Sequence, residues 1–332
     1  VYSVPAFMNE WYPRLMYYRG NPVYWQHRLK YGKNFNYKDF IPQFKAEKFD
    51  ADEWLRFFKA NKVQFIMPVG EHHDGFKMYG SELNKWNSVN MGPKRDILGE
   101  LKTASEKAGI EFCTSSHRAE HYWFLNGGKT VGYDNDTLHP ELADFYGPCF
   151  NPYTKNNLKY MSKQEKEGMR PTREWLEDWL ASSCELIDKY QPSALFFDWW
   201  VSSHEDFVPY TLKFAAYYCN RSVEWGKNIC IFYKSDKLKS NCFMLDRERT
   251  QLDDVYPKSW QSETSTAFNS WCYARTNIFK RPEEIAGTFL DTISKRGTFC
   301  LNLGPKADGT FCKKETDILS RLGVWLTVNE EA

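Results

Sequence analysis

Short apolar runs alternate with longer amphipathic stretches along this chain, and that order is its strongest constraint on the fold. The apolar runs have the length of strands, and several are apolar on both faces, as buried parallel strands are. They cover residues 63–69, 110–114, 194–197, 229–233, 243–245 and 299–303. Helical patterns cover residues 52–60, 94–108, 173–189, 209–226, 282–295 and 314–327. A β-α-β-α succession of this kind predicts a parallel α/β sheet or barrel.

The turns that follow the early strands decide between these two architectures. A doubly wound nucleotide-binding fold needs a Gly-x-Gly-x-x-Gly turn after an early strand, and the sequence contains no such motif. We therefore predict a (β/α)8 barrel of the TIM type. A chain of 332 residues with 42% hydrophobic content can bury the core of one such catalytic domain over residues 1–332.

Polar residues gather where four of the predicted strands end. The clusters are Glu71-His72-His73-Asp74-Gly75, Ser115-Ser116-His117-Arg118-Ala119-Glu120-His121, Asp198-Trp199-Trp200 and Asp246-Arg247-Glu248-Arg249. In a barrel the carboxyl ends of the strands meet on one face, which carries the active site, so these clusters become neighbours. Residues 126–170 and 252–277 are longer than connections need to be, and we interpret both as loops over that face.

Two carboxylates in these clusters are the candidate catalytic pair. Asp198 follows an apolar strand and precedes two tryptophans, which is a partly apolar setting for a nucleophile, and Glu248 ends another strand. A retaining glycosidase uses two carboxyls about 5 Å apart, one ionised to attack the sugar and one protonated to assist the leaving oxygen. Two other interpretations stay open at this stage. Asp198 could be the N-cap of the next helix, and Glu248 could be one solvated member of the charged run 246–249.

The histidines favour sugar binding over metal binding. His72 and His73 are adjacent, whereas metal ligands are normally spaced, and a site that adds Asp74, His117 and His121 remains a less favoured alternative. Imidazoles that donate to substrate hydroxyls need no metal, and we expect no cofactor.

Composition excludes some partners. Lys and Arg number 44 against 43 Asp and Glu, and this balance predicts no binding to nucleic acid or to a membrane surface. Nine cysteines occur without a Cys-x-x-Cys pair, so a zinc knuckle or redox motif is not indicated, and their disulfide state stays open. The sequence has no apolar run long enough to span a membrane and no leader. Its abrupt start is compatible with a signal removed upstream, so we expect a secreted, periplasmic or lysosomal protein.

Several motifs point to a particular family. They are Val1-Tyr2-Ser3-Val4-Pro5, Asn9-Glu10-Trp11-Tyr12, Glu71-His72-His73-Asp74-Gly75-Phe76, Phe196-Phe197-Asp198-Trp199-Trp200, Trp260-Gln261-Ser262-Glu263-Thr264-Ser265 with Ser270-Trp271, and Leu301-Asn302-Leu303-Gly304-Pro305-Lys306-Ala307-Asp308-Gly309. In this order they resemble the α-L-fucosidases of glycoside hydrolase family 29, from Val1 to about Asn329.

The resemblance implies a retaining exo-hydrolase that releases terminal α-L-fucose from a glycoconjugate. It implies that Asp198 is the nucleophile and that His72, His73 and Glu10 hold fucose hydroxyls. The family places its acid/base variably. In this sequence Glu248 is the candidate, and Glu263, near Trp260, is the rival. Two tryptophans, Trp199 and Trp260, are expected to form hydrophobic walls of the sugar pocket.

The sequence departs from the family at several points. A His-Trp-Gly segment on the first barrel strand of the family is not in this sequence, so we expect a barrel that lacks its first strand and has an unpaired edge. The common C-terminal β-sandwich of the family is not in this sequence either. His117 stands near the place of a family Tyr and is expected to take over its hydroxyl contact. Lys234 stands where many members have Arg, and it gives a point charge instead of a planar fork.

Three alternative functions remain. They are a sugar-binding relative with weak catalysis, a metal-dependent hydrolase that uses His72, His73 and Asp74, and a retaining glycosidase for a related sugar such as α-L-galactose. No pattern in the sequence predicts the fucosyl linkage, the aglycone or the oligomeric state.

Overall fold

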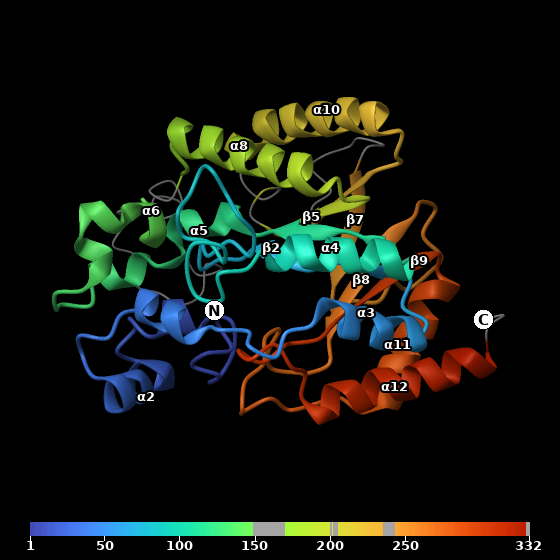
Figure 1. The fold of residues 1–332 in the computed structure, drawn as a ribbon, viewed down its shortest axis with the longest axis horizontal. Coiled ribbons are helices and arrows are strands. Elements are labelled where there is room, and N and C mark those ends of the chain that lie inside the picture. Colours follow the sequence, from blue (N-terminus) through green and yellow to red (C-terminus); the bar gives the residue numbers. More distant parts are fainter. Residues whose placement is uncertain (149–169, 200, 202–204, 235–242, 330–332) are drawn as a thin grey trace.

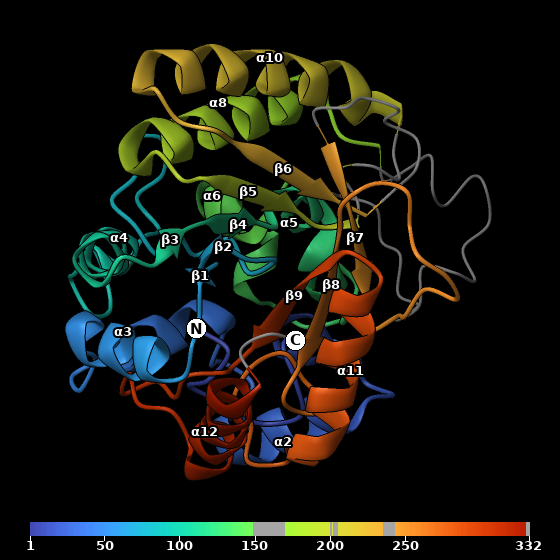
Figure 2. The same cartoon turned by 90° about the vertical axis from the view of Figure 1, so that its right-hand side faces the viewer.

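The computed structural model describes residues 1–148, 170–199, 201, 205–234 and 243–329. Its centre is a curled, seven-stranded parallel sheet in the order β2-β4-β5-β6-β7-β8-β9 (Figures 1 and 2). These strands are β2 (Val69–Glu71), β4 (Thr114–Ser116), β5 (Ala194–Phe197), β6 (Cys230–Tyr233), β7 (Phe243–Glu248), β8 (Trp260–Ser265) and β9 (Gly297–Asn302). The prediction of a barrel architecture is confirmed.

Two of the predicted strands are each divided in two. Residues 63–69 contain β1 (Phe65–Ile66) and the start of β2, and residues 110–114 contain β3 (Glu111–Phe112) and the start of β4. β1 pairs only with β3, in a separate two-stranded sheet. The interruption falls at Pro68, which has no N–H to give to a ladder, although its carbonyl still accepts from the Ser115 N–H at 3.2 Å.

The predicted helices form close to their expected bounds and lie outside the curled sheet (Figure 2). They are α3 (Ala51–Ala60), α4 (Ile97–Ala108), α8 (Arg173–Tyr190), α10 (Val208–Trp225), α11 (Pro282–Ser294) and α12 (Lys313–Val328). Side chains of Asp50, Asp96 and Thr172 cap α3, α4 and α8. Gly109 and Gly226 end α4 and α10 in the left-handed conformation.

One strand lies within a predicted loop. Residues 252–277 were expected to form a loop, but β8 occupies Trp260–Ser265 and pairs with both β7 and β9. This strand has no apolar run, because its residues Gln261 and Glu263 are polar. β7 is likewise longer than predicted, so Asp246 and Glu248 lie on the strand and not after it.

The other predicted loop is partly helical. The described part of residues 126–170 contains the short helices η2 (Asn126–Lys129), η3 (Asp136–Leu138), η4 (Pro140–Leu142) and α6 (Ala143–Tyr146). Residues 149–169 lie outside the described part. Additional helices before β1 and after β4 are α1 (Tyr12–Leu15), α2 (Pro22–Tyr31), η1 (Tyr37–Gln43) and α5 (Arg118–Phe124), and η6 (Glu205–Phe207) precedes α10.

The curled sheet is open between its edge strands β2 and β9, which do not pair with each other in the described part of the chain. The N-terminal segment crosses near this opening at the carboxyl ends of the strands. Its ammonium group on Val1 lies 3.4 Å from Asp74, after β2, and the Ala6 carbonyl accepts from the Arg275 N–H, after β8, at 3.0 Å. No helix in the described residues is long and apolar enough to cross a membrane.

Candidate active site

Asp198 directly follows β5 and occupies the centre of the polar cluster at the carboxyl ends of the strands. One carboxylate oxygen accepts from His117 Nδ1 at 3.1 Å and faces His73 Nε2 at 3.3 Å. The other accepts from the Trp199 main-chain N–H at 2.8 Å and pairs with Lys234 Nζ at 2.9 Å. Burial raises the pKa of Asp198, but the Lys234 charge and the bonds from His117 and His73 outweigh it and hold that pKa well below its usual range. Asp198 is therefore an ionised carboxylate.

Lys234 joins Asp198 to both candidate acids. Its ammonium, at the end of β6, lies 2.7 Å from Glu248 Oε2 and 2.7 Å from Glu263 Oε1. The Asp198 oxygen and either glutamate oxygen are therefore no more than about 5.6 Å apart, the sum of the two distances through the lysine. The Glu248 side chain is 40% exposed and that of Glu263 is 15% exposed. The structure brings Glu248 into the cluster, and it is not an isolated member of a solvated charged run.

Three histidine rings line one side of Asp198. His72 stacks on His117 with ring centroids 4.4 Å apart, and the His72 and His73 centroids are 4.2 Å apart. The second nitrogen of His117 lies 3.2 Å from Ser115 Oγ, and His72 Nδ1 lies 2.6 Å from the Tyr2 hydroxyl. Burial lowers the pKa of both His72 and His73, so both are neutral near pH 7 and can each donate and accept one hydrogen bond.

The same histidines are the residues that could hold a metal ion. One nitrogen from each of His72, His73 and His117 lies within 4.8 Å of the others, and His73 forms a second such group with Glu120 and Asp198. Asp74, which the metal alternative required, belongs to neither group in the described residues. Its carboxylate accepts from the Tyr37 hydroxyl at 2.8 Å and faces the Val1 ammonium instead.

A tight turn after β2 places His72 and His73. The Gly75 N–H donates to the His72 carbonyl at 3.1 Å, and Gly75 has φ +76°. A β-carbon on Gly75 would lie 2.4 Å from the His121 ring, whose Nδ1 lies 2.9 Å from the His73 carbonyl. Only glycine fits this turn, because its φ and the adjacent ring both exclude a side chain.

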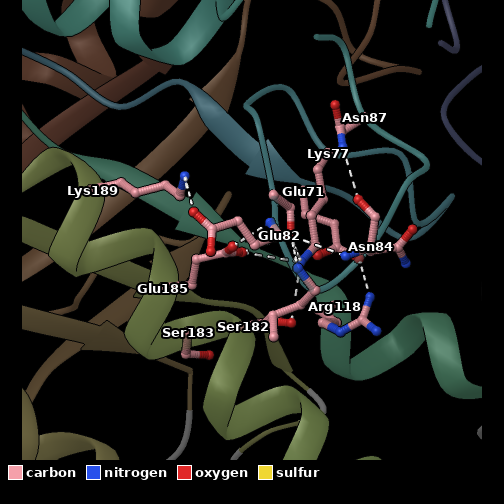
Figure 3. A network of polar contacts seen from close by, with 12 residues as sticks. Glu71, Lys77, Glu82, Asn84, Asn87, Arg118, Ser182, Ser183, Glu185 and Lys189 are labelled. Atoms are coloured by element: carbon pink, nitrogen blue, oxygen red, sulfur yellow. Dashed lines mark hydrogen bonds and ion pairs between the residues drawn. The ribbon is translucent and has the colours of Figure 1, made fainter. Parts of the chain in front are cut away.

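A buried ion network supports the start of this turn (Figure 3). Arg118, on α5, donates to Glu71 Oε1 at 2.5 Å and also pairs with Asp178 on α8. Lys77 lies 3.6 Å from Glu185 and donates to the Ser182 hydroxyl at 3.2 Å. Glu71 precedes His72 directly, so the network ties the first histidine segment to α5 and α8.

Glu10 lies in a neighbouring part of the same region. Its carboxylate accepts from the Trp271 N–H at 2.9 Å and from the Ser270 hydroxyl at 3.4 Å. Burial raises the pKa of Glu10. The ring centroid of Trp11, the next residue, lies 5.9 Å from that of His73, and this contact connects Glu10 to the histidine cluster.

The two predicted tryptophan walls have different outcomes. Trp199 gives Asp198 its main-chain N–H, and its half-buried ring lies 5.9 Å from the Trp123 ring. Trp260 is fully buried and donates from its indole N–H to the Lys295 carbonyl at the end of α11. Residues 260 and 263 point to opposite faces of β8, and Glu263 points inward, so Trp260 packs outward against the helices. The prediction of Trp260 as a pocket wall is wrong.

Some residues that support the cluster inside the barrel were not predicted from the sequence. Asp246 is 2% exposed and accepts from Gln261 Nε2 at 2.8 Å. Alternation along β7 provides the signal, because residues 246 and 248 point to the same face of the strand. Ser115 and Tyr2 orient two of the histidines, and no pattern in the sequence distinguished either one.

A buried carboxylate with two further carboxyls within reach, at the carboxyl ends of a parallel barrel sheet, is an arrangement that barrel glycoside hydrolases use. The family model described as alpha-L-fucosidase matches residues 1–331, and the chain belongs to that family.

Known proteins agree with this assignment. The chain is 28% identical over 345 residues to the tissue alpha-L-fucosidase of Homo sapiens, and the match covers 100% of this chain and 65% of that protein. It is 27% identical to the human plasma alpha-L-fucosidase, again covering 100% and 65%. The crystal structure of Thermotoga maritima alpha-fucosidase in complex with a mechanism based inhibitor matches with a TM-score of 0.77 at 27% identity, covering 100% of this chain and 71% of that one. The chain thus spans 65% of the length of these human relatives.

Proposed function

We propose that this chain is the catalytic barrel of a retaining exo-α-L-fucosidase that releases terminal fucose from glycoconjugates. The observation that carries the proposal is the ionised Asp198 with Glu248 and Glu263 within about 5.6 Å of it. Family membership and the human and Thermotoga relatives support fucose as the sugar. We further propose a secreted, periplasmic or lysosomal location, which is in line with the similarity to a plasma enzyme.

The reaction has two displacement steps. Asp198 attacks the anomeric carbon while a protonated glutamate gives its proton to the leaving oxygen, and the bond to the aglycone breaks. The same glutamate, now ionised, takes a proton from water, which attacks the anomeric carbon and releases Asp198. The ammonium of Lys234 contacts both carboxyls, and we propose that the bound sugar displaces it from one of them. We assign the acid/base role to Glu248, whose greater exposure gives it access to the leaving group and to water.

The remaining side chains bind the sugar. The neutral rings of His72 and His73 can donate to hydroxyls and accept from them, the His117 ring lies beside them, and Glu10 offers a buried acceptor. Trp199 adds apolar surface beside Asp198. Hydrogen bonds to the sugar that shorten as the sugar ring distorts stabilise the transition state more than the ground state. Specific discrimination against α-L-galactose requires a close fit at the methyl group of fucose, because a single added hydroxyl is weakly rejected by an apolar pocket.

The test is hydrolysis of an aryl α-L-fucoside by the wild type, followed by azide rescue of two variants. Asp198→Gly is expected to be inactive and to form β-fucosyl azide when azide is supplied. Glu248→Ala is expected to form α-fucosyl azide, with Glu263→Ala as the matched comparison. Sugar binding without release of the aryl alcohol would refute the enzymatic proposal, and α-azide from Glu263→Ala alone would move the acid/base role to Glu263.

A further inference from the structure

Asp246 is a fourth carboxyl at the same site, and the proposed reaction does not use it. It lies on β7 two residues before Glu248 and points into the barrel, where it is 2% exposed. One oxygen accepts from Gln261 Nε2 at 2.8 Å. The other, Oδ2, is buried and has no hydrogen-bond partner among the described residues. The titratable groups that face it are Glu263 on β8, Lys234 after β6 and Cys300 on β9.

The charges in this cluster do not balance if every carboxyl is ionised. Asp198, Asp246, Glu248 and Glu263 would carry four negative charges, and Lys234 is the one ammonium that pairs with any of them in the described part of the chain. The histidine closest to Asp198 on the β2 side, His73, has a lowered pKa and adds no positive charge near pH 7. Four carboxylates outnumber the cations that face them, and such an excess of negative charge in a largely buried site is costly, so the cluster must retain protons.

The surroundings of each carboxyl decide where a proton stays. Asp198 has the lysine, two imidazoles and a main-chain N–H as partners. Glu248 and Glu263 each pair with the lysine, and Glu248 is also open to water. Asp246 has a single neutral donor and is the least exposed of the four. Glu263, on the neighbouring strand β8, is a side-chain hydrogen-bonding neighbour of Asp246. Two carboxyl oxygens can share a hydrogen bond only if one of them carries a proton.

We propose that Asp246 is a positioning residue that stays protonated and donates a hydrogen bond from Oδ2 to the Glu263 carboxylate. Burial and the neighbouring charge of Glu263 raise the pKa of Asp246, which supports this arrangement. Glu263 then accepts hydrogen bonds from both Asp246 and Lys234 and is not available as the acid. The role of proton donor falls to Glu248. This inference rests on the proposed function for its catalytic consequence, but not for the proton itself.

Asp246→Asn is the sharpest test, because an asparagine reproduces the shape and the donor of a protonated aspartate. The first measurement is the infrared difference spectrum between wild type and variant, in which the carbonyl stretch of a protonated carboxylic acid is expected to disappear. Asp96→Asn is the matched control. Asp96 accepts hydrogen bonds from the Gly99 N–H and the Tyr190 hydroxyl outside the site, so no such band should change. The second measurement is the pH–rate profile on an aryl α-L-fucoside.

We expect Asp246→Asn to keep kcat/KM within about threefold and to leave the acid limb of the profile in place, because the hydrogen bond is preserved. Asp246→Leu lacks the donor and is expected to lose kcat/KM about tenfold or more, with a shifted pH profile. An unchanged carboxylic-acid band in Asp246→Asn, or an acid limb displaced by a full pH unit in that variant, would overturn the proposal. If the wild type fails to cleave the fucoside while the band still disappears, the proposed function fails and the proton on Asp246 stands.

Discussion

The positive charge of Lys234 offsets the negative charge of the acidic cluster, and removing it gives the most direct test of the site's electrostatics. Lys234→Met takes away the ammonium that lies 2.9 Å from Asp198, 2.7 Å from Glu248 and 2.7 Å from Glu263. Coulomb attraction at an effective dielectric constant of about 20 sets an upper limit of about 6 kcal/mol for a single contact of this length. The partly exposed Glu248 contributes little of this, because water screens it.

The net loss is smaller than this limit, because the variant also avoids the cost of burying the lysine. Breaking one buried ion pair costs about 3–5 kcal/mol. We expect Lys234→Met to lower the free energy of unfolding by about 3 kcal/mol at pH 7. The loss should shrink as the pH falls. Without the lysine, the folded-state pKa of Asp198 rises above its unfolded value, so protonation in mild acid relieves the repulsion. In the wild type that pKa is depressed, and its stabilising effect is lost only at still lower pH.

Urea unfolding of wild type, Lys234→Met and Lys234→Arg at pH 7 and pH 4.5 measures both the size and the direction of this effect. Lys234→Arg keeps the charge and serves as the matched control, so its difference from wild type should change little between the two pH values. The electrostatic account would be refuted by a Lys234→Met loss that is equal at the two pH values or larger in acid.

Three further outcomes follow from the described contacts. Burial lowers the pKa of His121 to about 4, below its value in the unfolded chain. The unfolded state therefore binds the proton more tightly, and the free energy of unfolding falls by about 3 kcal/mol as the pH drops from 6.5 to 4. His121→Asn should reduce that pH dependence in a series of urea titrations, and an unchanged pH dependence would contradict the assignment. Gly75→Ala should cost about 2–3 kcal/mol and displace the His73 segment, because φ is +76° and the β-carbon meets the His121 ring; a thermal midpoint equal to wild type would refute this. Trp260→Ala should lower the free energy of unfolding by about 3–5 kcal/mol, because it leaves a cavity in the core, while KM for a fucoside stays near the wild-type value. A specific rise in KM would indicate that Trp260 contacts the sugar after all.

The helices were predictable because their local signals agree with their packing. α3 begins after the capping residue Asp50, and α4 ends at the left-handed Gly109. Both ends could be read from residue type alone, since a cap needs only the side chain of one residue near the turn. β5 was predicted without error, because all four of its residues are buried and apolar.

β8 was not predictable from apolar runs, because a barrel strand near an active site buries polar side chains. Glu263 and Gln261 point inward and find partners in Lys234 and Asp246, which come from other strands. A search of one segment cannot detect partners that are distant in sequence. The prediction that Trp260 lines the sugar pocket could have been rejected from the sequence, however. Once a strand is assumed, residues 260 and 263 must lie on opposite faces, so both could not line one pocket.

Burial of charge does not by itself distinguish the candidate active site from the rest of the fold. Near β2, Glu71, Asp178 and Glu185 face two cations, Arg118 and Lys77, so the charges are almost balanced and the network can hold one fixed arrangement. At Asp198, three carboxyls pair with one lysine, and a fourth, Asp246, lies close enough to feel its charge. Such an excess forces protons to be retained and makes their location sensitive to a ligand that displaces the lysine. Acid/base chemistry needs a proton that is bound but transferable, and only the second cluster provides one.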